Sequence, residues 1–277
     1  MALNIDIQQV MKDIPPLPDV VNDIIMSLND DSANIEILTN KIMMDPALAT
    51  RVLKIANSPF YGLSGKISSL KEACIVLGSY SIKNLAVAAG IVNKLSKSGN
   101  AINTVKLWEH AVGTGAAARV IAEKKGLDYE IAFTSGLLHD VGKIILDINY
   151  PVEYKQVMEY RASHNCFLCE AENDVLGITH AEIGELCASH WKLPDVIRDV
   201  ISNHHKPDNS DAVMPSIIHL ADILCRSLEI GYPGDGLIPC IHPIISSHNI
   251  VSTSELSEIL PVVDSLSQTL IKLIVSK

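Results

Sequence analysis

The chain has 277 residues, 48% of them hydrophobic and 19% charged, so it can bury one large core or two smaller cores, and disorder is disfavoured. Acidic residues outnumber basic residues by 32 to 22, and the formal charge of −10 disfavours nucleic acid and anionic lipid as partners. A local basic patch would still allow a phosphorylated small molecule or signalling nucleotide to bind.

No apolar run reaches the roughly 20 residues that a membrane-spanning helix needs. The first residues lack the basic and apolar segments of a signal peptide, so we expect a cytoplasmic protein with no membrane partner. Six cysteines are scattered along the chain, and we expect them to be thiols. Cys166 and Cys169 form a single CxxC pair without a thioredoxin-like strand pattern around it, which favours ordinary thiols over a redox or zinc site.

Apolar residues recur every three or four positions, which predicts an all-α fold with no strand. The prolines of IPPLP, residues 14–18, mark the start of the globular domain. Asp45 and Pro46 are typical of a helix N-cap and first helical position, and Ser79 is a candidate cap further on. The helices predicted in this part span residues 19–28, 34–44, 46–56 and 68–78, with a turn at 57–62.

A polar stretch from Lys94 to Asn103 predicts the junction between an N-terminal helical lobe and the rest of the chain. The helices predicted beyond it span residues 105–124, 129–146, 151–164, 170–176, 180–191, 194–204 and 215–229. The segment 231–248 is rich in Gly, Pro and Ser. Residues 254–275 are expected to form one or two closing helices, broken at Pro261.

Ionisable residues in apolar surroundings suggest a metal site. His139 and Asp140 are adjacent, and on a helix neighbouring side chains point about 100° apart. The two residues could therefore bind the same metal ion only if other helices supplied its remaining ligands. The candidates lie on predicted helices or at their ends: His110, His180, His204, His205 and Asp222. An unpaired ionisable group would be costly to bury there. Imidazole and carboxylate ligands suit a divalent transition metal such as Fe, Mn, Zn or Ni, as one ion or as two bridged by a carboxylate.

The alternative is a helical scaffold without metal, in which each histidine is packed and hydrogen-bonded and Asp140 caps a helix. This alternative predicts that the named histidines are scattered in space. The histidines without motif support are expected to be structural, and they are His164, His190, His219, His242 and His248. His219 is a partial exception, because it lies one helical turn before Asp222 and could orient that carboxylate.

Several segments resemble a known family. The run HDVGK at 139–143, with His110 upstream and Asp222 downstream, resembles the metal-binding pattern of the HD superfamily of phosphohydrolases. The resemblance to the HDOD domain of bacterial signalling proteins is closer and covers residues 14–228. It rests on IPPLP at 14–18, MDPALATRVLKIANSPFYG at 44–62, ISSLKEACIVLG at 67–78, HAEIG at 180–184 and WKLP at 191–194.

The resemblance implies two packed helical lobes: an N-terminal lobe at 14–95 and an HD-like metal-binding lobe at 104–228, followed by a loop and closing helices at 229–277. It assigns the first metal to His110, His139, Asp140 and Asp222. It assigns a second, as in HD-GYP phosphodiesterases, to His180, His204 and His205, with Asp140 as the bridge. Asp140 and Lys143 are the implied catalytic residues, and Lys143 matches the lysine that meets the substrate phosphate.

The chain departs from the HD-GYP pattern in one respect. No Gly-Tyr-Pro follows the paired histidines, where Lys206 leads into PDNSDAV instead. The sequence Gly231-Tyr232-Pro233 does occur, but it lies beyond Asp222, and we expect it to form a loop turn.

Two functions remain open from the sequence. The first is a metal-dependent phosphohydrolase of bacterial signal transduction that acts on a nucleotide or a signalling phosphodiester. The second is a non-catalytic HDOD regulatory module with a structural metal, whose N-terminal lobe binds a protein partner or ligand. The sequence does not identify the substrate, the number and identity of the metal ions, the input signal or the oligomeric state.

Overall fold

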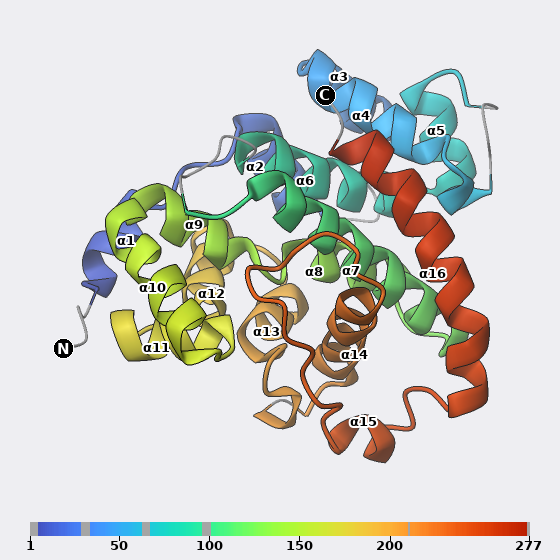
Figure 1. The fold of residues 1–277 in the computed structure, drawn as a ribbon. Coiled ribbons are helices and arrows are strands. Elements are labelled where there is room, and N and C mark those ends of the chain that lie inside the picture. Colours follow the sequence, from blue (N-terminus) through green and yellow to red (C-terminus); the bar gives the residue numbers. More distant parts are fainter. Residues whose placement is uncertain (1–4, 29–33, 63–66, 96–100, 210, 276–277) are drawn as a thin grey trace.

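The structure, a computed structural model, describes residues 5–28, 34–62, 67–95, 101–209 and 211–275. These residues form helices and connecting loops with no strand among them (Figure 1), which confirms the all-α prediction. The first part of the chain forms α1 (Ile7–Asp13), α2 (Asp19–Met26), α3 (Ile35–Met43), α4 (Pro46–Ala56), the short 3-10 helix η1 (Pro59–Tyr61), α5 (Leu70–Leu77) and α6 (Ser79–Leu95).

The second part of the chain contains the longest helices and the candidate metal ligands. It forms α7 (Thr104–Lys124), α8 (Tyr129–Leu138), α9 (Val141–Asn149), α10 (Pro151–His164), α11 (Leu168–Leu176), α12 (His180–His190), α13 (Asp195–Asn203), the 3-10 helix η2 (Pro207–Asn209), α14 (Val213–Ser227), α15 (Ile244–Ser247) and α16 (Thr253–Ile274). No helix among the described residues is both long enough and apolar enough to cross a bilayer.

Side chains at the helix starts explain many of these boundaries. Asp45 accepts hydrogen bonds from the backbone amides of the first turn of α4, as its position before Pro46 predicts. Thr179 and Glu182 form a reciprocal capping box at the start of α12, which fixes where that helix begins. The first residue of α12 is therefore His180, one of the candidate ligands.

The predicted helix over 129–146 is wrong, because the chain forms two helices there. α8 ends at Leu138 and α9 begins at Val141, so His139 and Asp140 lie at the junction between them. Asp140 leaves the helical conformation, with φ −99° and ψ 11°. The apolar pattern continues across the break, and a non-helical residue between two helices frees both side chains from the fixed angle of a continuous helix.

The expected break at Pro261 is also wrong, because α16 runs through it without interruption. A proline inside a helix removes one backbone hydrogen bond and normally destabilises the helix. α16 packs against α7 and α4, and it buries Ile259, Val263 and Leu270 there. We attribute the continuity to this apolar contact, which offsets the missing hydrogen bond.

The first and second parts of the chain contact each other where α6 packs on α8 and where α16 packs on α4. α6 contacts α2, α4 and α5, whereas α7 contacts α8, α14 and α16 (Figure 1). The division at Lys94–Asn103 stays a prediction, and residues 96–100 of that stretch lie outside the described residues. The closing helix α16 packs on both α4 and α7.

A buried ion pair lies where these two parts of the chain meet. Arg119 of α7 donates to Glu130 of α8 at 2.8 Å, and Tyr61 of η1 donates to the other oxygen of Glu130 at 2.9 Å. The guanidinium also lies over the rings of Tyr61 and Tyr129, at 4.6 and 4.3 Å from their centroids. The contact ties η1 to the start of α8, the helix that leads to His139.

Candidate metal centre

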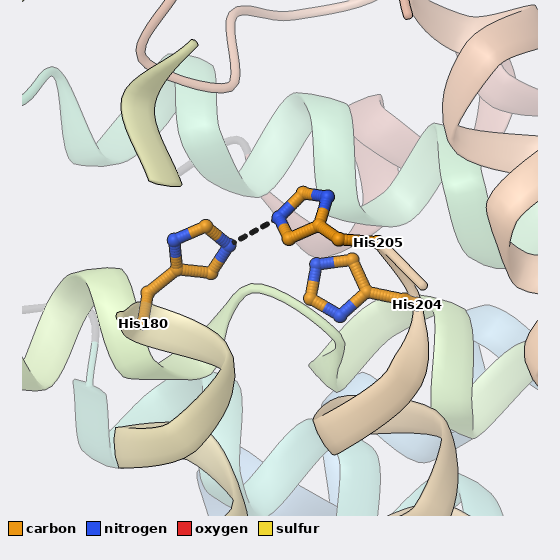
Figure 2. A group of neighbouring side chains, drawn as sticks. All are labelled: His180, His204 and His205. Atoms are coloured by element: carbon orange, nitrogen blue, oxygen red, sulfur yellow. Dashed lines mark hydrogen bonds between the residues drawn. The ribbon is translucent and has the colours of Figure 1, made fainter. Parts of the chain in front are cut away.

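The seven predicted ligands come from five separate parts of the chain and meet in one place. His110 lies on α7, His139 and Asp140 at the α8–α9 junction, His180 at the start of α12 and Asp222 on α14. The paired histidines His204 and His205 directly follow α13 (Figure 2). All except His205 are at most 3% exposed. The histidines are therefore clustered, which the scaffold without metal does not predict.

Asp140 lies at the centre of the cluster. One of its carboxylate oxygens, Oδ1, is 3.3 Å from Nε2 of His180 and 3.7 Å from Nε2 of His204. The other, Oδ2, is 3.3 Å from Nε2 of His139. Two sets of three residues have ligand atoms within 4.8 Å of one another, namely His110, His139 and Asp140, and His180, His204 and His205. Asp140 belongs to the first set, and its Oδ1 faces His180 and His204 of the second.

Hydrogen bonds at Nδ1 determine which nitrogen of each ring bears the proton. Nδ1 of His139 is 2.6 Å from the carbonyl oxygen of Gly136, and Nδ1 of His204 is 2.9 Å from that of Ile201. A carbonyl oxygen can only accept, so Nδ1 is the donor in both rings. In the neutral rings Nε2 is then unprotonated and carries a lone pair, and the Nε2 atoms of both rings face Asp140.

These atoms have no other partner. Nε2 of His139, Nε2 of His204 and Oδ1 of Asp140 are all buried without a hydrogen-bond partner among the described residues. Lone pairs that face one another across 3–4 Å in a buried site are unfavourable unless a proton or cation lies between them. The donor set of imidazole nitrogen and carboxylate oxygen suits a divalent transition metal, so the residues present fit such an ion.

The charge states favour metal binding as well. Burial, followed by the neighbouring imidazoles, holds the pKa of His204 and of His205 well below the ordinary histidine value. Burial alone would raise the pKa of Asp140, but His139 and Lys143 outweigh it and hold that pKa well below its ordinary value. Metal ligands must be unprotonated, and these pKa directions leave His204, His205 and Asp140 unprotonated at neutral pH.

Asp222 is held by two partners. Its Oδ1 is 2.8 Å from Nε2 of His110, and Nε of Arg226 donates to both of its oxygens at 2.9 and 3.0 Å. Burial would raise the pKa of Asp222, but Arg226 and His110 hold it well below the ordinary value. Arg226 in turn donates to Asp235 in the loop after α14. The carboxylate is thus ionised and fixed on the His110 side of the cluster.

Lys143 faces the carboxylate from α9. Its ammonium donates to Oδ2 of Asp140 at 2.7 Å and to the backbone carbonyl of Pro233 at 2.9 Å, and its side chain is fully buried. The segment Gly231-Tyr232-Pro233 is a loop, as expected, but it also covers this lysine. Gly231 adopts φ +68°, and a Cβ there would lie 2.2 Å from the backbone nitrogen of His110, so only glycine fits this close approach.

His219 does not orient Asp222. Its Nδ1 is instead 2.8 Å from the backbone carbonyl of His204, so it holds the end of α13 that carries the paired histidines. The pairing of His219 with Asp222 rested on helical spacing alone, which cannot identify a contact to another helix.

Sequence reasoning missed Glu172 and Tyr154. Oε2 of Glu172 accepts from the backbone nitrogen of His180 at 2.8 Å and lies 2.6 Å from Nδ1 of the same residue. Tyr154 donates to Oε1 of Glu172 at 2.7 Å, and both residues are fully buried. Burial lowers the pKa of His180, but the charge of Glu172 outweighs it and leaves that pKa above its ordinary value.

A cleft of about 700 Å³ adjoins the cluster at His205. Its lining includes Lys206, three acidic residues and both cysteines of the CxxC pair; the acidic residues are Glu170, Asp174 and Glu182. His205 is the only one of the seven predicted ligands that lines this cleft. The cleft therefore meets the cluster at His205.

An all-helical fold in which buried imidazoles from several helices surround an adjacent His-Asp pair defines a protein of the HD type. The HDOD domain family matches residues 14–207, which is more than half of the chain. The chain therefore belongs to the HDOD domain family of the HD superfamily. The matched region contains six of the seven predicted ligands and ends before Asp222.

Two curated relatives show how far the similarity extends. An uncharacterised protein of Treponema pallidum (strain Nichols) is 28% identical over 222 residues, which cover 78% of this chain and 43% of that protein. A ribonuclease Y of Thermus thermophilus is 28% identical over 116 residues, which cover 42% of this chain and 16% of the enzyme. The chain thus spans less than half the length of either relative.

Solved structures agree on the fold. An HDOD domain protein of unknown function from Geobacter sulfurreducens has 26% identity and a TM-score of 0.76, covering 94% of this chain and 99% of that one. A protein of Shewanella amazonensis SB2B, provisionally described as a metal-dependent phosphohydrolase, has 19% identity and a TM-score of 0.68, covering 95% and 96%. At this identity the second similarity concerns the fold alone.

Proposed function

We propose that the chain is a signal-transduction protein whose HD-type centre binds one or two divalent transition metal ions and hydrolyses a phosphate ester. One observation carries the proposal. The bare nitrogens of His139 and His204 and an oxygen of Asp140 face one another in a buried site, with no hydrogen-bond partner among the described residues. Such an arrangement is favourable when a cation lies between the ligands.

In this proposal His110, His139, Asp140 and Asp222 would hold one ion. His180, His204 and His205 would hold another, with Asp140 shared between them. A bound divalent ion supplies positive charge for phosphoryl oxygens and acidity for water.

The residues around these ligands have separate roles. Lys143 contributes a fixed positive charge beside Asp140 and would stabilise the negative charge that develops on the phosphoryl group. The burial of the ligands excludes bulk water and strengthens these charge interactions. His205 and Lys206 line the cleft and would meet the substrate first.

The cleft supports a small phosphorylated substrate, such as a signalling nucleotide, rather than a polynucleotide. A volume of about 700 Å³ is within the range of small-molecule sites. The name of one similar protein, a ribonuclease, concerns a phosphate ester. The net charge of −10 disfavours RNA. Without a Gly-Tyr-Pro after His205, we do not extend the proposal to cyclic di-GMP.

A second candidate is a regulatory module with a structural metal, whose N-terminal lobe binds a protein partner. The hydrogen bonds of Lys143 favour this candidate. The buried ammonium already donates to Asp140 and to the carbonyl of Pro233, so it is not free to bind a phosphate. In this arrangement the lysine would have to leave Pro233 to reach a phosphate in the cleft.

Hydrolysis of bis-p-nitrophenyl phosphate by the metal-loaded protein separates the two candidates. The phosphohydrolase predicts turnover that Lys143→Ala lowers by about 100-fold, as expected for one electrostatic group at the reacting centre. Metal binding without turnover of this ester or of a panel of nucleotides favours the regulatory module. Full turnover in Lys143→Ala contradicts the role given to that lysine.

A further inference from the structure

We propose that Glu172, held in place by Tyr154, is a positioning residue for the metal centre that fixes the ring orientation and tautomer of His180. The inference deepens the proposed function, because it rests on His180 being a metal ligand. It assigns a role to the α10–α11 pair of helices, which contributes none of the seven predicted ligands.

Glu172 lies on α11 with no exposed surface, and a buried carboxylate is favourable only when its oxygens are fully hydrogen-bonded. Both oxygens are engaged. Oε1 accepts from the hydroxyl of Tyr154 at 2.7 Å, while Oε2 accepts from the backbone of His180 at 2.8 Å and lies 2.6 Å from Nδ1 of the same residue. The carboxylate therefore links α10, α11 and the first residue of α12.

The contact with His180 has a direct effect on its ring. A carboxylate can only accept, so Nδ1 bears the proton, and in the neutral ring Nε2 is left as a lone pair. Because one oxygen contacts both the backbone and the ring of His180, it restricts the side-chain torsions. The ring then points Nε2 toward Oδ1 of Asp140, at 3.3 Å. Figure 2 shows the same nitrogen directed at Nε2 of His205, 2.9 Å away.

The rings of the other histidines are oriented in a different way. His139 and His204 are oriented by backbone carbonyls three residues earlier, in the helices that they directly follow, and no substitution removes these carbonyls. His180 is the first residue of its helix and has no preceding helical turn to provide such a carbonyl. The orientation of His180 therefore depends on a side chain from another helix, and residues that orient metal-binding histidines are commonly carboxylates.

The chain offers a matched control. Glu130 is also a buried glutamate that accepts from a tyrosine hydroxyl, that of Tyr61 at 2.9 Å, and its other carboxylate oxygen accepts from Arg119 instead of a histidine. The conservative variants Tyr154→Phe and Tyr61→Phe each remove the corresponding hydroxyl. A purely structural role for Glu172 would make the two pairs behave alike.

The first test uses metal-free full-length protein and 15N NMR of the histidine rings. His180 should show a protonated Nδ1 in the wild type and in Tyr61→Phe. In Glu172→Ala it should become a mixture of tautomers. At a pH where the His180 ring is neutral, a proton on Nε2 instead of Nδ1 in the wild type, or an unchanged His180 signal in Glu172→Ala, would overturn the inference. Neither result depends on whether the protein hydrolyses anything.

The second test measures Zn²⁺ and Mn²⁺ affinity by competition with a chelating dye. Glu172→Ala should bind about 10–100-fold more weakly than wild type, as is usual for loss of such a partner, whereas Glu172→Gln, which keeps an accepting oxygen, should bind at an intermediate level. Tyr61→Phe and Glu130→Gln should bind as the wild type does. In a His180→Ala background, Glu172→Ala should have no further effect.

The outcomes of the two proposals can be told apart. Equal metal affinity in wild type and Glu172→Ala overturns the inference and leaves the proposed function intact. Weaker binding in Glu172→Ala, with no hydrolysis by any variant, supports the inference while the proposed hydrolase activity fails. A wild type that binds no metal but has the expected His180 tautomer contradicts the proposed function and restricts Glu172 to orienting the ring.

Discussion

His110 and Asp222 are joined by a 2.8 Å contact between Nε2 and Oδ1, which links α7 to α14 within the cluster of candidate ligands. Arg226 donates to both oxygens of the same carboxylate, so Asp222 neutralises a buried guanidinium while it faces an imidazole. The carboxylate is therefore part of a buried charge network, whether or not a metal is bound.

Asp222→Ala should destabilise the metal-free protein by about 3 kcal/mol, because it leaves the buried Arg226 with Asp235 as its remaining carboxylate partner. Urea denaturation in the presence of a chelator measures this. The exposed Asp211→Ala should stay within about 0.5 kcal/mol of wild type. Equal stability of the two variants would show that the Arg226 network contributes little.

Gly142→Ala should disturb the contact between α9 and α12. A Cβ at Gly142 would lie 1.9 Å from the carbonyl oxygen of His180, and a backbone atom cannot move aside as a flexible side chain could. We expect a loss of about 1–3 kcal/mol in stability, together with weaker metal binding. At Gly236 an added Cβ meets nothing within 4 Å, so Gly236→Ala should be tolerated. Thermal denaturation of both variants is the measurement.

Alkaline pH should destabilise the fold through buried tyrosines. Burial first, then the neighbouring Glu172, raises the pKa of Tyr154 well above its ordinary value, and burial with Glu130 does the same for Tyr61. A raised folded-state pKa means that stability is complete below about pH 10 and is lost as pH rises above it, by about 1.4 kcal/mol per pH unit for each tyrosine.

Denaturation at pH 8, 10 and 11 tests this expectation. Tyr154→Phe should be less stable than wild type at pH 8 but should lose less stability between pH 10 and 11. Parallel pH profiles for the two proteins would contradict the raised pKa of Tyr154.

Thiol labelling should separate the cysteines by burial. Cys240 is exposed, whereas burial raises the pKa of Cys187 to about 12 and that of Cys169 to about 11. The thiolate is the reactive form, so iodoacetamide at pH 8 should label Cys240 first and Cys187 only after unfolding. Peptide mapping by mass spectrometry measures the order. Fast labelling of Cys169, or a disulfide to Cys166, would revive the redox interpretation of the CxxC pair.

Local signals predicted much of the fold. Pro151 starts α10 at the predicted residue, and Asp45 caps α4 as expected, because these effects depend on a few neighbouring residues. The break at His139–Asp140 and the continuity through Pro261 were not predicted. The break and the continuous helix both depend on contacts with helices that are distant in the sequence, and hydrophobic periodicity carries no information on such contacts.

The candidate site was also predicted only in part. The ligand types and their place on separate helices could be read from the sequence, since a charged or imidazole side chain in an apolar run is conspicuous. Glu172 was missed because it occurs in the polar run Glu170-Ala-Glu-Asn-Asp174, where a glutamate is expected to face solvent. The covering role of Pro233 was missed because its contact with Lys143 uses a backbone carbonyl, which carries no sequence signal.

Metal content tests the central claim most directly. The full chain would be incubated with Fe²⁺, Mn²⁺, Zn²⁺ or Ni²⁺, dialysed and analysed for metal per chain beside Asp140→Ala, with circular dichroism to confirm that both are folded. We predict one or two ions per wild-type chain and a loss of metal in the folded variant, because the carboxylate of Asp140 faces histidines of both sets. A wild type that retains none of these ions would contradict the account.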